Sequence, residues 1–430
     1  MSEQIVRVGM LGCGNVGAAV ARMLDEHAED IAARTGVRVQ LAKVAVREPG
    51  RERDVPLPAN AFTSDATSIV DDPGIDVVIE VIGGIQPAKA LLLRAIANGK
   101  RVVTANKELL ATQGRELFDA ADAAGLDLLF EAAVAGGTPL IRPIKESLAG
   151  ERVHRCMGIV NGTTNFILTQ MSEHGWGFDD ALAEAQRLGY AEPDPTADVE
   201  GYDAAAKCAI VASIAFTTRV VASDVYREGI AGITAQDIAD ADRLGYVVKL
   251  LAIAELTEGQ ISVRVHPAMI PAAHPLASVR DAFNAVFVEG ERVGQLMFYG
   301  RGAGGDPTAT SVIGDVIQAA RHVAFGGRSV GCTCVLERPI RSMADTMTQY
   351  YLNLHVHDVP GVLAEIAARF AEHEVSIERV WQEGSGDEAT LVFITHKARE
   401  GAFQDTVEQL RKMESVRSVA SLLRVEGEEG

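Results

Sequence analysis

The 430-residue sequence predicts an α/β protein: a doubly wound parallel sheet, then an α+β domain, then a C-terminal ferredoxin-like module of βαββαβ order. Three observations predict this order. Strands and helices alternate strictly up to residue 131, the alternation fades beyond residue 150, and short strands return near the C-terminus around two amphipathic helices. We therefore place domains at residues 1–135, 136–326 and 350–425, with a linker at 327–349.

The composition is that of a globular protein, with 47% hydrophobic and 23% charged residues. A formal net charge of −19 disfavours nucleic acid and anionic membrane surfaces as partners. The N-terminus lacks the features of a signal peptide, and no apolar run reaches transmembrane length. Five scattered cysteines fit free thiols in a reducing cytoplasm, and Cys332 and Cys334 lack the further ligands that a zinc site needs. We therefore expect a cytoplasmic protein with neither a nucleic-acid nor a membrane partner.

A glycine-rich turn follows the first predicted strand, residues 5–11, and precedes a helix at 18–27. Its G-x-G-x-x-G pattern permits a tight turn and close backbone approach, and the helix N-terminus would face a pyrophosphate. In this strand–turn–helix context we interpret the pattern as the phosphate loop of a Rossmann-type dinucleotide domain. A plain structural turn is the alternative. The loop residues that would contact the cofactor are Gly12, Gly14, Asn15, Val16 and Gly17.

The end of the second predicted strand, residues 38–46, should carry the residue that reads the ribose. An acidic residue there would favour NAD, but the chain has Arg47, which suits a 2′-phosphate and favours NADP. Glu48, the next residue, leaves NAD open. The alternative is that the arginines of this loop are ordinary solvated charges with no role in binding the cofactor.

Further strands are predicted at residues 76–82, 101–104 and 126–130, with helices at 87–99 and 108–125. Ligands of such sheets bind beyond the carboxyl ends of the strands. Thr104 and Lys107 lie at one of these ends, and Glu131 lies at another. A lysine at a strand end is a stronger candidate for function than a lysine elsewhere on the surface.

The second domain begins with a predicted strand at residues 153–160, followed by the polar start of a helix at 161–165. These polar residues suit helix capping as well as substrate contact. A later glycine-rich loop, residues 300–309, precedes a helix at 310–322. That loop could wrap the cofactor from the far side or be a structural turn.

The segment from Gly189 to Lys207 contains five carboxylates and one lysine. Two prolines keep its first half extended, and the pattern becomes helical after Asp198. Asp203 and Lys207 are four residues apart on a helix face that continues into Ile210 and further apolar residues. We therefore expect this helix to enter the core, with the pair at the rim of a cleft. An ordinary surface ion pair is the alternative.

A dinucleotide site beside lysines and carboxylates suggests hydride transfer. Oxidation of an alcohol needs a general base, and a lysine qualifies if burial or a second cation lowers its pKa. Lys107 and Lys207 could lower each other's pKa, while the carboxylates hold a cationic group such as an α-ammonium. Spacing alone assigns neither role.

Four ordered motifs resemble those of homoserine dehydrogenases and together cover roughly residues 5–325. The signature motif is residues 185–192 with Asp198, Gly201, Asp203 and Lys207. The others are residues 104–107, residues 161–165, and residues 302–304 with 307–309. The resemblance implies NAD(P)-dependent interconversion of L-homoserine and L-aspartate 4-semialdehyde, in threonine and methionine biosynthesis.

The resemblance also implies roles for individual residues. Lys107 and Lys207 would be the acid/base groups, and Glu192 and Asp203 would bind the substrate. Thr104, Lys107, Gly189 and Gly304 would join the glycine loop in holding the cofactor. A sodium ion would lie on Glu131, Val134, Gly136 and Thr138, largely through backbone oxygens, although the residue types here do not indicate a metal independently.

The C-terminal module follows the order strand 351–357, helix 362–373, strands 375–381 and 390–395, helix 399–413 and strand 418–425. Its first strand–helix loop, residues 358–363, resembles that of ACT domains. The resemblance implies a module that pairs with its copy, within a homodimer or homotetramer, and binds an amino-acid effector, naturally L-threonine, near Asp358, Gly361 and Val362. A purely dimerising module is the alternative. The acidic tail, residues 426–430, is expected to fray.

Two other classes of protein remain open from the sequence. A nucleotide-sensing regulator would keep the glycine loop and the C-terminal module, but it would not need Lys107 and Lys207 together with Glu192 and Asp203. A different Rossmann oxidoreductase would keep the lysines but not the ordered motifs. Turnover of homoserine would separate the three.

Overall fold

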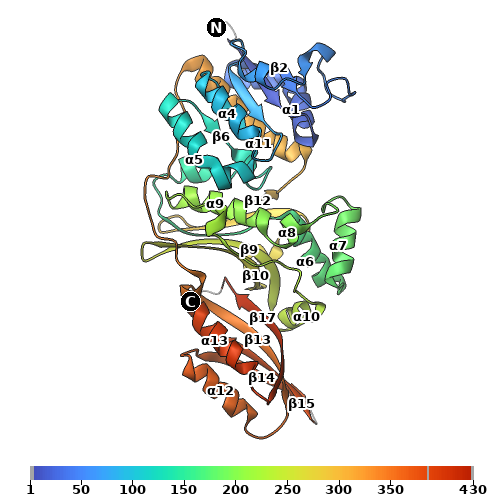
Figure 1. Cartoon of the computed structure of the whole chain (residues 1–430), viewed down its shortest axis with the longest axis vertical. Coiled ribbons are helices and arrows are strands. Elements are labelled where there is room, and N and C mark those ends of the chain that lie inside the picture. Colours follow the sequence, from blue (N-terminus) through green and yellow to red (C-terminus); the bar gives the residue numbers. More distant parts are fainter. Residues whose placement is uncertain (1–3, 385–386, 428–430) are drawn as a thin grey trace. The chain divides into compact units, whose positions relative to one another are not determined.

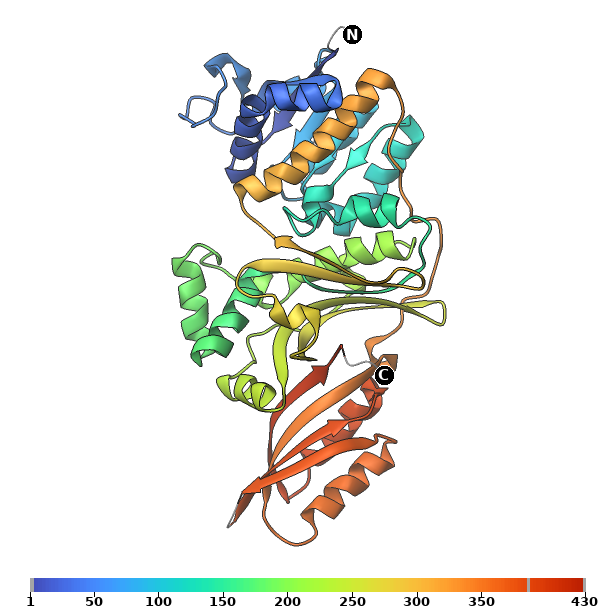
Figure 2. The same cartoon turned by 180° about the vertical axis from the view of Figure 1, so that it is seen from behind.

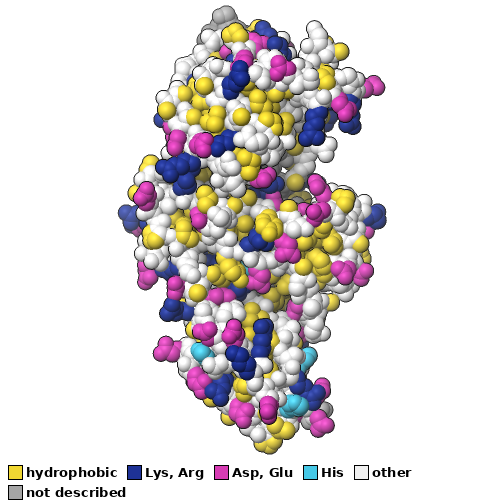
Figure 3. Space-filling model, in the orientation of Figure 1, with side chains coloured by type: hydrophobic (Ala, Val, Ile, Leu, Met, Phe, Trp, Pro, Cys, Tyr) yellow, Lys and Arg dark blue, Asp and Glu magenta, His cyan; other side chains and the backbone are white. Residues whose placement is uncertain are grey.

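The computed structural model describes residues 4–384 and 387–427. The chain forms two compact units, each built from segments distant in sequence. Unit 1 comprises residues 1–162, 203–225 and 282–337, and unit 2 comprises residues 163–202, 226–281 and 338–430. Within the described ranges, no helix is both long and apolar enough to span a membrane. On the face drawn in Figure 3, basic and acidic side chains are interspersed.

Unit 1 contains a six-stranded parallel sheet in the order β3-β2-β1-β4-β5-β6. The strands are β1 (Gln4–Leu11), β2 (Val37–Ala45), β3 (Phe62–Thr63), β4 (Val77–Glu80), β5 (Arg101–Thr104) and β6 (Leu128–Leu129). The chain order reverses between β1 and β4, so the loop after β1 lies at the switch point where such sheets bind ligands. The predicted doubly wound sheet is confirmed.

Helices cover both faces of this sheet (Figure 1). One face packs against α1 (Asn15–Glu26), α2 (Ala28–Thr35) and α11 (Gly305–Phe325). The other packs against α3 (Thr67–Val70), α4 (Ala88–Ala97) and α5 (Lys107–Ala124). Figure 2 shows α11, in orange, lying across the strands beside the blue helices. Although the sequence analysis placed α11 in the segment 136–326, its apolar face completes the core of the nucleotide-binding sheet.

The rest of unit 1 includes an antiparallel set in the order β12-β11-β7. These strands are β7 (Val153–Ile159), β11 (Phe283–Gly290) and β12 (Gly294–Arg301). Helix α9 (Tyr202–Ala215) is buried on nearly every side, as expected of a helix that enters the core. Short helical turns occur at η1 (Ala59–Ala61), η2 (Glu131–Ala133), η3 (Pro143–Ser147) and η4 (Ala222–Asp224).

Unit 2 contains a long antiparallel hairpin of β9 (Tyr246–Thr257) and β10 (Gln260–Pro271). β9 was not among the predicted strands, because its almost continuous apolar run lacks the alternation that marks a strand. A two-residue strand, β8 (Tyr226–Arg227), pairs with β10 in parallel. The helices of this part are α6 (Gly162–His174), α7 (Phe178–Arg187), α8 (Thr196–Val199) and α10 (Ala235–Arg243), with 3₁₀ turns η5 (Pro275–Ser278) and η6 (Met343–Asp345).

The C-terminal module of unit 2 has the predicted βαββαβ order. Its elements are β13 (Met347–His357), α12 (Val362–Glu372), β14 (Ile377–Gly384), β15 (Glu388–Thr395), the short β16 (Ala398–Arg399), α13 (Glu400–Leu410) and β17 (Val416–Val425). The strands pair antiparallel in the order β17-β13-β15-β14, and both helices pack on one face (Figure 1). β17 also pairs in parallel with β10, which joins the module to the hairpin.

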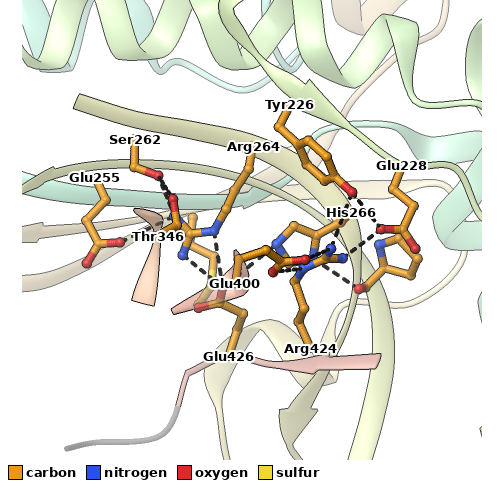
Figure 4. A network of polar contacts seen from close by, with 12 residues as sticks. Tyr226, Glu228, Glu255, Ser262, Arg264, His266, Thr346, Glu400, Arg424 and Glu426 are labelled. Atoms are coloured by element: carbon orange, nitrogen blue, oxygen red, sulfur yellow. Dashed lines mark hydrogen bonds and ion pairs between the residues drawn. The ribbon is translucent and has the colours of Figure 1, made fainter. Parts of the chain in front are cut away.

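The expectation of a frayed tail is wrong for Glu426. This residue is buried, and its carboxylate lies 2.8 Å from the Arg264 guanidinium on β10 (Figure 4). Residues 428–430 lie outside the described part of the chain. The buried ion pair between Arg264 and Glu426 therefore joins the C-terminal module to the hairpin, in addition to the pairing of β17 with β10.

Candidate active site

The glycine loop after β1 has the geometry of a phosphate cradle. Gly12 has φ of +101°, which favours glycine, and a Cβ at Gly17 would lie 2.5 Å from the Gly12 carbonyl oxygen. A Cβ at Gly14 would meet nothing within 4 Å, so open space lies beside the start of α1. Gly12 and Gly17 are therefore required by backbone packing, and Gly14 borders the space that a dinucleotide would occupy.

A second helix begins beside this loop. Gly305 starts α11, and a Cβ on it would lie 3.1 Å from the backbone oxygen of Asn15, the first residue of α1. Its N-cap, Gly304, has φ of +120°. Two helix N-termini thus lie next to one another, and both favour an anion. This placement supports the predicted contribution of Gly304 to the cofactor site.

The arginines after β2 have different surroundings. Arg53 donates to the backbone oxygens of Glu48 (2.9 Å) and Arg51 (2.7 Å), so it shapes the loop. Arg47 lies exposed two residues beyond the end of β2. Among these arginines, Arg47 therefore occupies the position where a ribose-reading residue is expected.

A buried carboxylate organises the ends of β4 and β5. Glu80 accepts from the Thr104 hydroxyl (2.6 Å) through one oxygen and from the backbone N–H groups of Ile82 and Gly83 through the other. Asn106 caps α5 by accepting from the N–H of Leu109. The hydroxyl of Thr104 therefore fixes the loops around the site. Glu80 was not among the predicted site residues, although an acidic residue at the end of an apolar strand is a signal that could have identified it.

The two predicted catalytic lysines meet at a single carboxylate in unit 1. The Lys107 Nζ lies 2.7 Å from Asp203 Oδ1, and the Lys207 Nζ lies 2.6 Å from Asp203 Oδ2. Lys207 also donates to the backbone oxygen of Val160 (2.7 Å), and the Asn161 amide donates to Asp203 (2.9 Å). Lys107 comes from the start of α5, and Asp203 and Lys207 come from α9. The structure thus brings together residues that are up to 100 positions apart (107 to 207).

Burial and charge differ within this cluster. The side chain of Lys207 is 10% exposed, and that of Lys107 is 43% exposed. Burial alone would raise the pKa of Asp203, but the Lys207 and Lys107 ammonium groups outweigh it and hold that pKa below its ordinary value. Asp203 is therefore an anion that lies between the two lysine side chains. The mutual lowering of the lysines' pKa values stays a prediction, and the structure adds the Asp203 carboxylate between the two lysines.

The other predicted substrate and cofactor residues lie in unit 2. Gly189 follows α7 with φ of +79°, and Glu192 is exposed three residues later. The backbone oxygen of Glu192 accepts from the Gln186 side chain (3.2 Å), which ties this segment to α7. The carboxylate of Glu192 is thus presented from a segment whose backbone is held in place.

The predicted sodium residues form a turn after β6 in unit 1. The Glu131 carboxylate accepts hydrogen bonds from the backbone N–H groups of Ile141 (2.7 Å) and Arg142 (2.8 Å), so both of its oxygens already have partners within the protein. The Thr138 hydroxyl is buried, and no hydrogen bond to it is found among the described residues. Within those residues no cluster of three His, Cys, Asp or Glu side chains could hold a metal. A cation held by the predicted residues would therefore bind to the Thr138 hydroxyl and to the backbone oxygens of Glu131, Val134 and Gly136 rather than to side-chain carboxylates.

The predicted effector residues lie in the loop between β13 and α12. Gly361 is the N-cap of α12 with φ of +100°, and Val362 is buried at the start of that helix. Asp358 accepts from the Gln382 side chain of β14 (3.2 Å). The loop is therefore held by its own module.

Comparisons with known proteins agree with this architecture. The family model for homoserine dehydrogenase matches residues 139–317, its NAD-binding domain matches residues 12–131, and the ACT domain matches residues 350–415. The homoserine dehydrogenase of Mycobacterium tuberculosis (strain ATCC 25618 / H37Rv) is 50% identical over 436 residues, covering 99% of this chain and 98% of that protein.

Solved structures are similar as well. A homoserine dehydrogenase from Thiobacillus denitrificans matches with a TM-score of 0.92 and 40% identity, covering 99% of each chain. A hyperthermophilic archaeal homoserine dehydrogenase in complex with NADPH matches with a TM-score of 0.61 and 28% identity, covering 74% of this chain and 98% of that one.

The nucleotide-binding sheet, the lysine–carboxylate cluster and these matches define an NAD(P)-dependent oxidoreductase with a C-terminal ACT domain. More particularly, the chain belongs to the homoserine dehydrogenase family.

Proposed function

We propose that the cluster of Lys107, Asp203 and Lys207 performs the proton transfer in the interconversion of L-homoserine and L-aspartate 4-semialdehyde. The observation that carries this proposal is the bridging carboxylate, with the two ammonium groups 2.7 and 2.6 Å from its two oxygens. An NAD(P)H bound at the glycine loop would supply the hydride. The protein must then supply a proton to the carbonyl oxygen, or remove one from the hydroxyl in the reverse direction.

Asp203 suits aldehyde reduction in particular. The lysine ammonium groups hold the pKa of Asp203 below its ordinary value, so Asp203 is an anion beside both of them, and a lysine ammonium is the kind of proton donor that reduction of a carbonyl requires. Lys207, held by Asp203 and the Val160 oxygen, can give a directed proton, and the more exposed Lys107 can exchange protons with solvent. Asp203 would thereby hold both lysine side chains in position, in addition to the substrate binding that the family resemblance implies. Glu192 would bind the substrate ammonium.

The cofactor is proposed to be NADP. Arg47 is exposed just beyond the end of β2, where a ribose-reading residue is expected. The Arg53 side chain instead donates hydrogen bonds to backbone oxygens of its own loop. The adjacent N-termini of α1 and α11 support pyrophosphate binding by Gly12, Gly14, Asn15, Val16, Gly17 and Gly304. Thr104 would contribute by fixing the loops, and Gly189 would contribute from unit 2.

A sodium ion is also proposed, on the observation that the buried Thr138 hydroxyl has no hydrogen-bond partner among the described residues. L-threonine is proposed as the effector of the ACT domain, bound near Asp358, Gly361 and Val362, where two copies of the module would pair within a homodimer or homotetramer. The enzyme would work in the cytoplasm in threonine and methionine biosynthesis. The odd number of cysteines, five scattered along a large chain, supports a reducing compartment.

Turnover by the purified full-length protein tests these proposals. Absorbance of the reduced cofactor is followed with L-homoserine and either NADP or NAD, and with L-aspartate 4-semialdehyde and NADPH, each with and without L-threonine. The proposals predict substrate-dependent rates, preference for NADP and inhibition by L-threonine. Absence of a rate from folded protein with either cofactor would contradict the activity, and a rate insensitive to L-threonine would contradict the effector.

A further inference from the structure

The short segment formed by residues 226–229 has two faces that contact different parts of unit 2. On one face, Glu228 accepts from Arg424 of β17 (2.7 Å), and the Tyr226 hydroxyl accepts from the same guanidinium (3.3 Å), as Figure 4 shows. Arg424 is 2% exposed and also forms two hydrogen bonds to Glu400 of α13. This face therefore contacts the ACT domain through a buried, fully paired cation.

The other face of the same segment contacts the turn that leads into α9. The Arg227 guanidinium donates to the backbone oxygen of Glu200 (2.6 Å) and lies 3.5 Å from the centre of the Tyr202 ring. A Cβ on Gly229 would lie 2.4 Å from the Val199 oxygen, so the two backbones are in direct contact. Because alternate residues of an extended chain point to opposite sides, consecutive residues contact the ACT domain and this turn.

The turn leads directly into the proposed catalytic residues. Tyr202 is the first residue of α9, Asp203 is the second, and Lys207 follows one helical turn later. Because Tyr202 and Asp203 are adjacent in the chain, a displacement of Tyr202 also displaces the backbone of Asp203. Gly201, immediately before, has φ of +79°, and a Cβ there would lie 3.3 Å from the Arg227 side chain. The start of α9 is thus set partly by Arg227.

We propose that Arg227 is a positioning residue for Asp203 and Lys207, and that residues 226–229 transmit the position of the ACT domain to α9. This inference rests on the catalytic roles proposed above for Asp203 and Lys207. The coupling is physical, because a buried guanidinium is costly to leave unpaired, so a displacement of β17 must move Glu228 with Arg424 or break their ion pair. Glu228 adjoins Arg227 in the chain, so such a movement displaces the Arg227 contacts.

The first test replaces Arg227 in the full-length enzyme. Arg227→Met removes the hydrogen bond and the charge above Tyr202, and we expect kcat to fall about tenfold, since small misplacements of catalytic groups cost up to about 10²-fold. The Kd for NADPH should stay within twofold. Arg227→Lys retains a cation and should recover part of kcat. Arg280→Met, which removes an exposed ion pair with Glu173 in the same unit, is the matched control and should leave kcat unchanged.

The outcomes separate this inference from the proposed function. A normal kcat for Arg227→Met, beside an inactive Asp203→Asn enzyme, would overturn the positioning role and leave the proposed function intact. An active Asp203→Asn enzyme would overturn both. A parallel loss of kcat and of NADPH affinity in Arg227→Met, without recovery in Arg227→Lys, would also overturn the role, because it would indicate general damage to the fold.

A double-mutant cycle tests the transmission itself. Glu228→Gln weakens the contact with Arg424. We expect kcat to fall about two- to fivefold, which corresponds to the lower end of the interaction energies between residues of one hydrogen-bond network. Combined with Arg227→Met, the loss should be clearly smaller than the product of the single losses. Losses that multiply would overturn the coupling, whereas Glu228→Gln combined with Arg280→Met should multiply as unrelated sites do.

Discussion

The Lys207 ammonium lies 2.6 Å from the Asp203 carboxylate, one helical turn away on α9, in an environment where both side chains are at least 90% shielded from solvent (10% and 8% exposed). A buried pair of this kind is costly to disturb, because either partner left alone is an uncompensated charge. Lys107 approaches the other oxygen of the same carboxylate from α5. The proposed proton transfer depends on this arrangement.

Loss of the Lys207 amine should lower kcat and leave cofactor binding intact. We expect Lys207→Ala to lower kcat by about 10²–10⁴-fold, the range of general acid/base catalysis. The Kd for NADPH, measured by fluorescence titration, should remain near that of the wild-type enzyme, because Lys207 bonds to Asp203 and Val160 rather than to the glycine loop. Retention of most of kcat would show that Lys207 is structural.

Replacement of Arg47 should change cofactor preference. Arg47→Ala removes the cation expected at the 2′-phosphate, and we expect kcat/KM for NADPH to fall about tenfold or more, as for loss of a hydrogen bond to a charged group. The value for NADH should change little. Arg51→Ala, an exposed arginine of the same loop, is the control. An equal loss for both cofactors would argue that Arg47 does not read the phosphate.

The ion pair between Arg264 and Glu426 should stabilise the junction of β10 with the ACT domain. Both side chains are almost fully buried, and Glu426→Gln leaves the Arg264 guanidinium with the more distant, partly exposed Glu255 (3.4 Å) as a remaining carboxylate partner, so we expect a cost of up to about 3–5 kcal/mol. The midpoint of urea unfolding should fall accordingly. Glu258→Gln, which neutralises the exposed carboxylate of an ion pair with Arg341, should have a negligible effect. Equal midpoints for the two variants would contradict the role of the buried pair.

His266 should make the enzyme less stable in acid. Burial, with Arg424 nearby, lowers the pKa of His266 to about 3, so the folded side chain is neutral. Between pH 6.5 and about 3 the unfolded chain binds one more proton than the folded chain, and this contribution to stability is lost as the pH falls, by up to about 1.4 kcal/mol per unit. Thermal unfolding between pH 7 and 5 should show a shallower fall for His266→Gln than for the wild type. Parallel curves would show that His266 does not titrate this way.

Local features of the sequence predicted much of the fold and the proximity of Asp203 and Lys207. The strand, glycine turn and helix at residues 5–27 are adjacent in the chain, and Asp203 and Lys207 share a helix face, so neither depended on distant contacts. The packing of α11 on the first sheet, the carboxylate shared with Lys107, and the contacts of Arg227 and Glu426 all join residues distant in sequence. Periodicity carries no information on such contacts.

The most direct test of the account is the kcat of Asp203→Asn with L-aspartate 4-semialdehyde and NADPH. Asparagine keeps the shape of the side chain but removes the charge that holds both lysines. We predict a fall in kcat of about 10²-fold or more with the Kd for NADPH unchanged, whereas Asp194→Asn, which neutralises an exposed carboxylate of the same segment, should match the wild type. An Asp203→Asn enzyme that keeps most of its kcat would contradict the bridging carboxylate as the centre of catalysis.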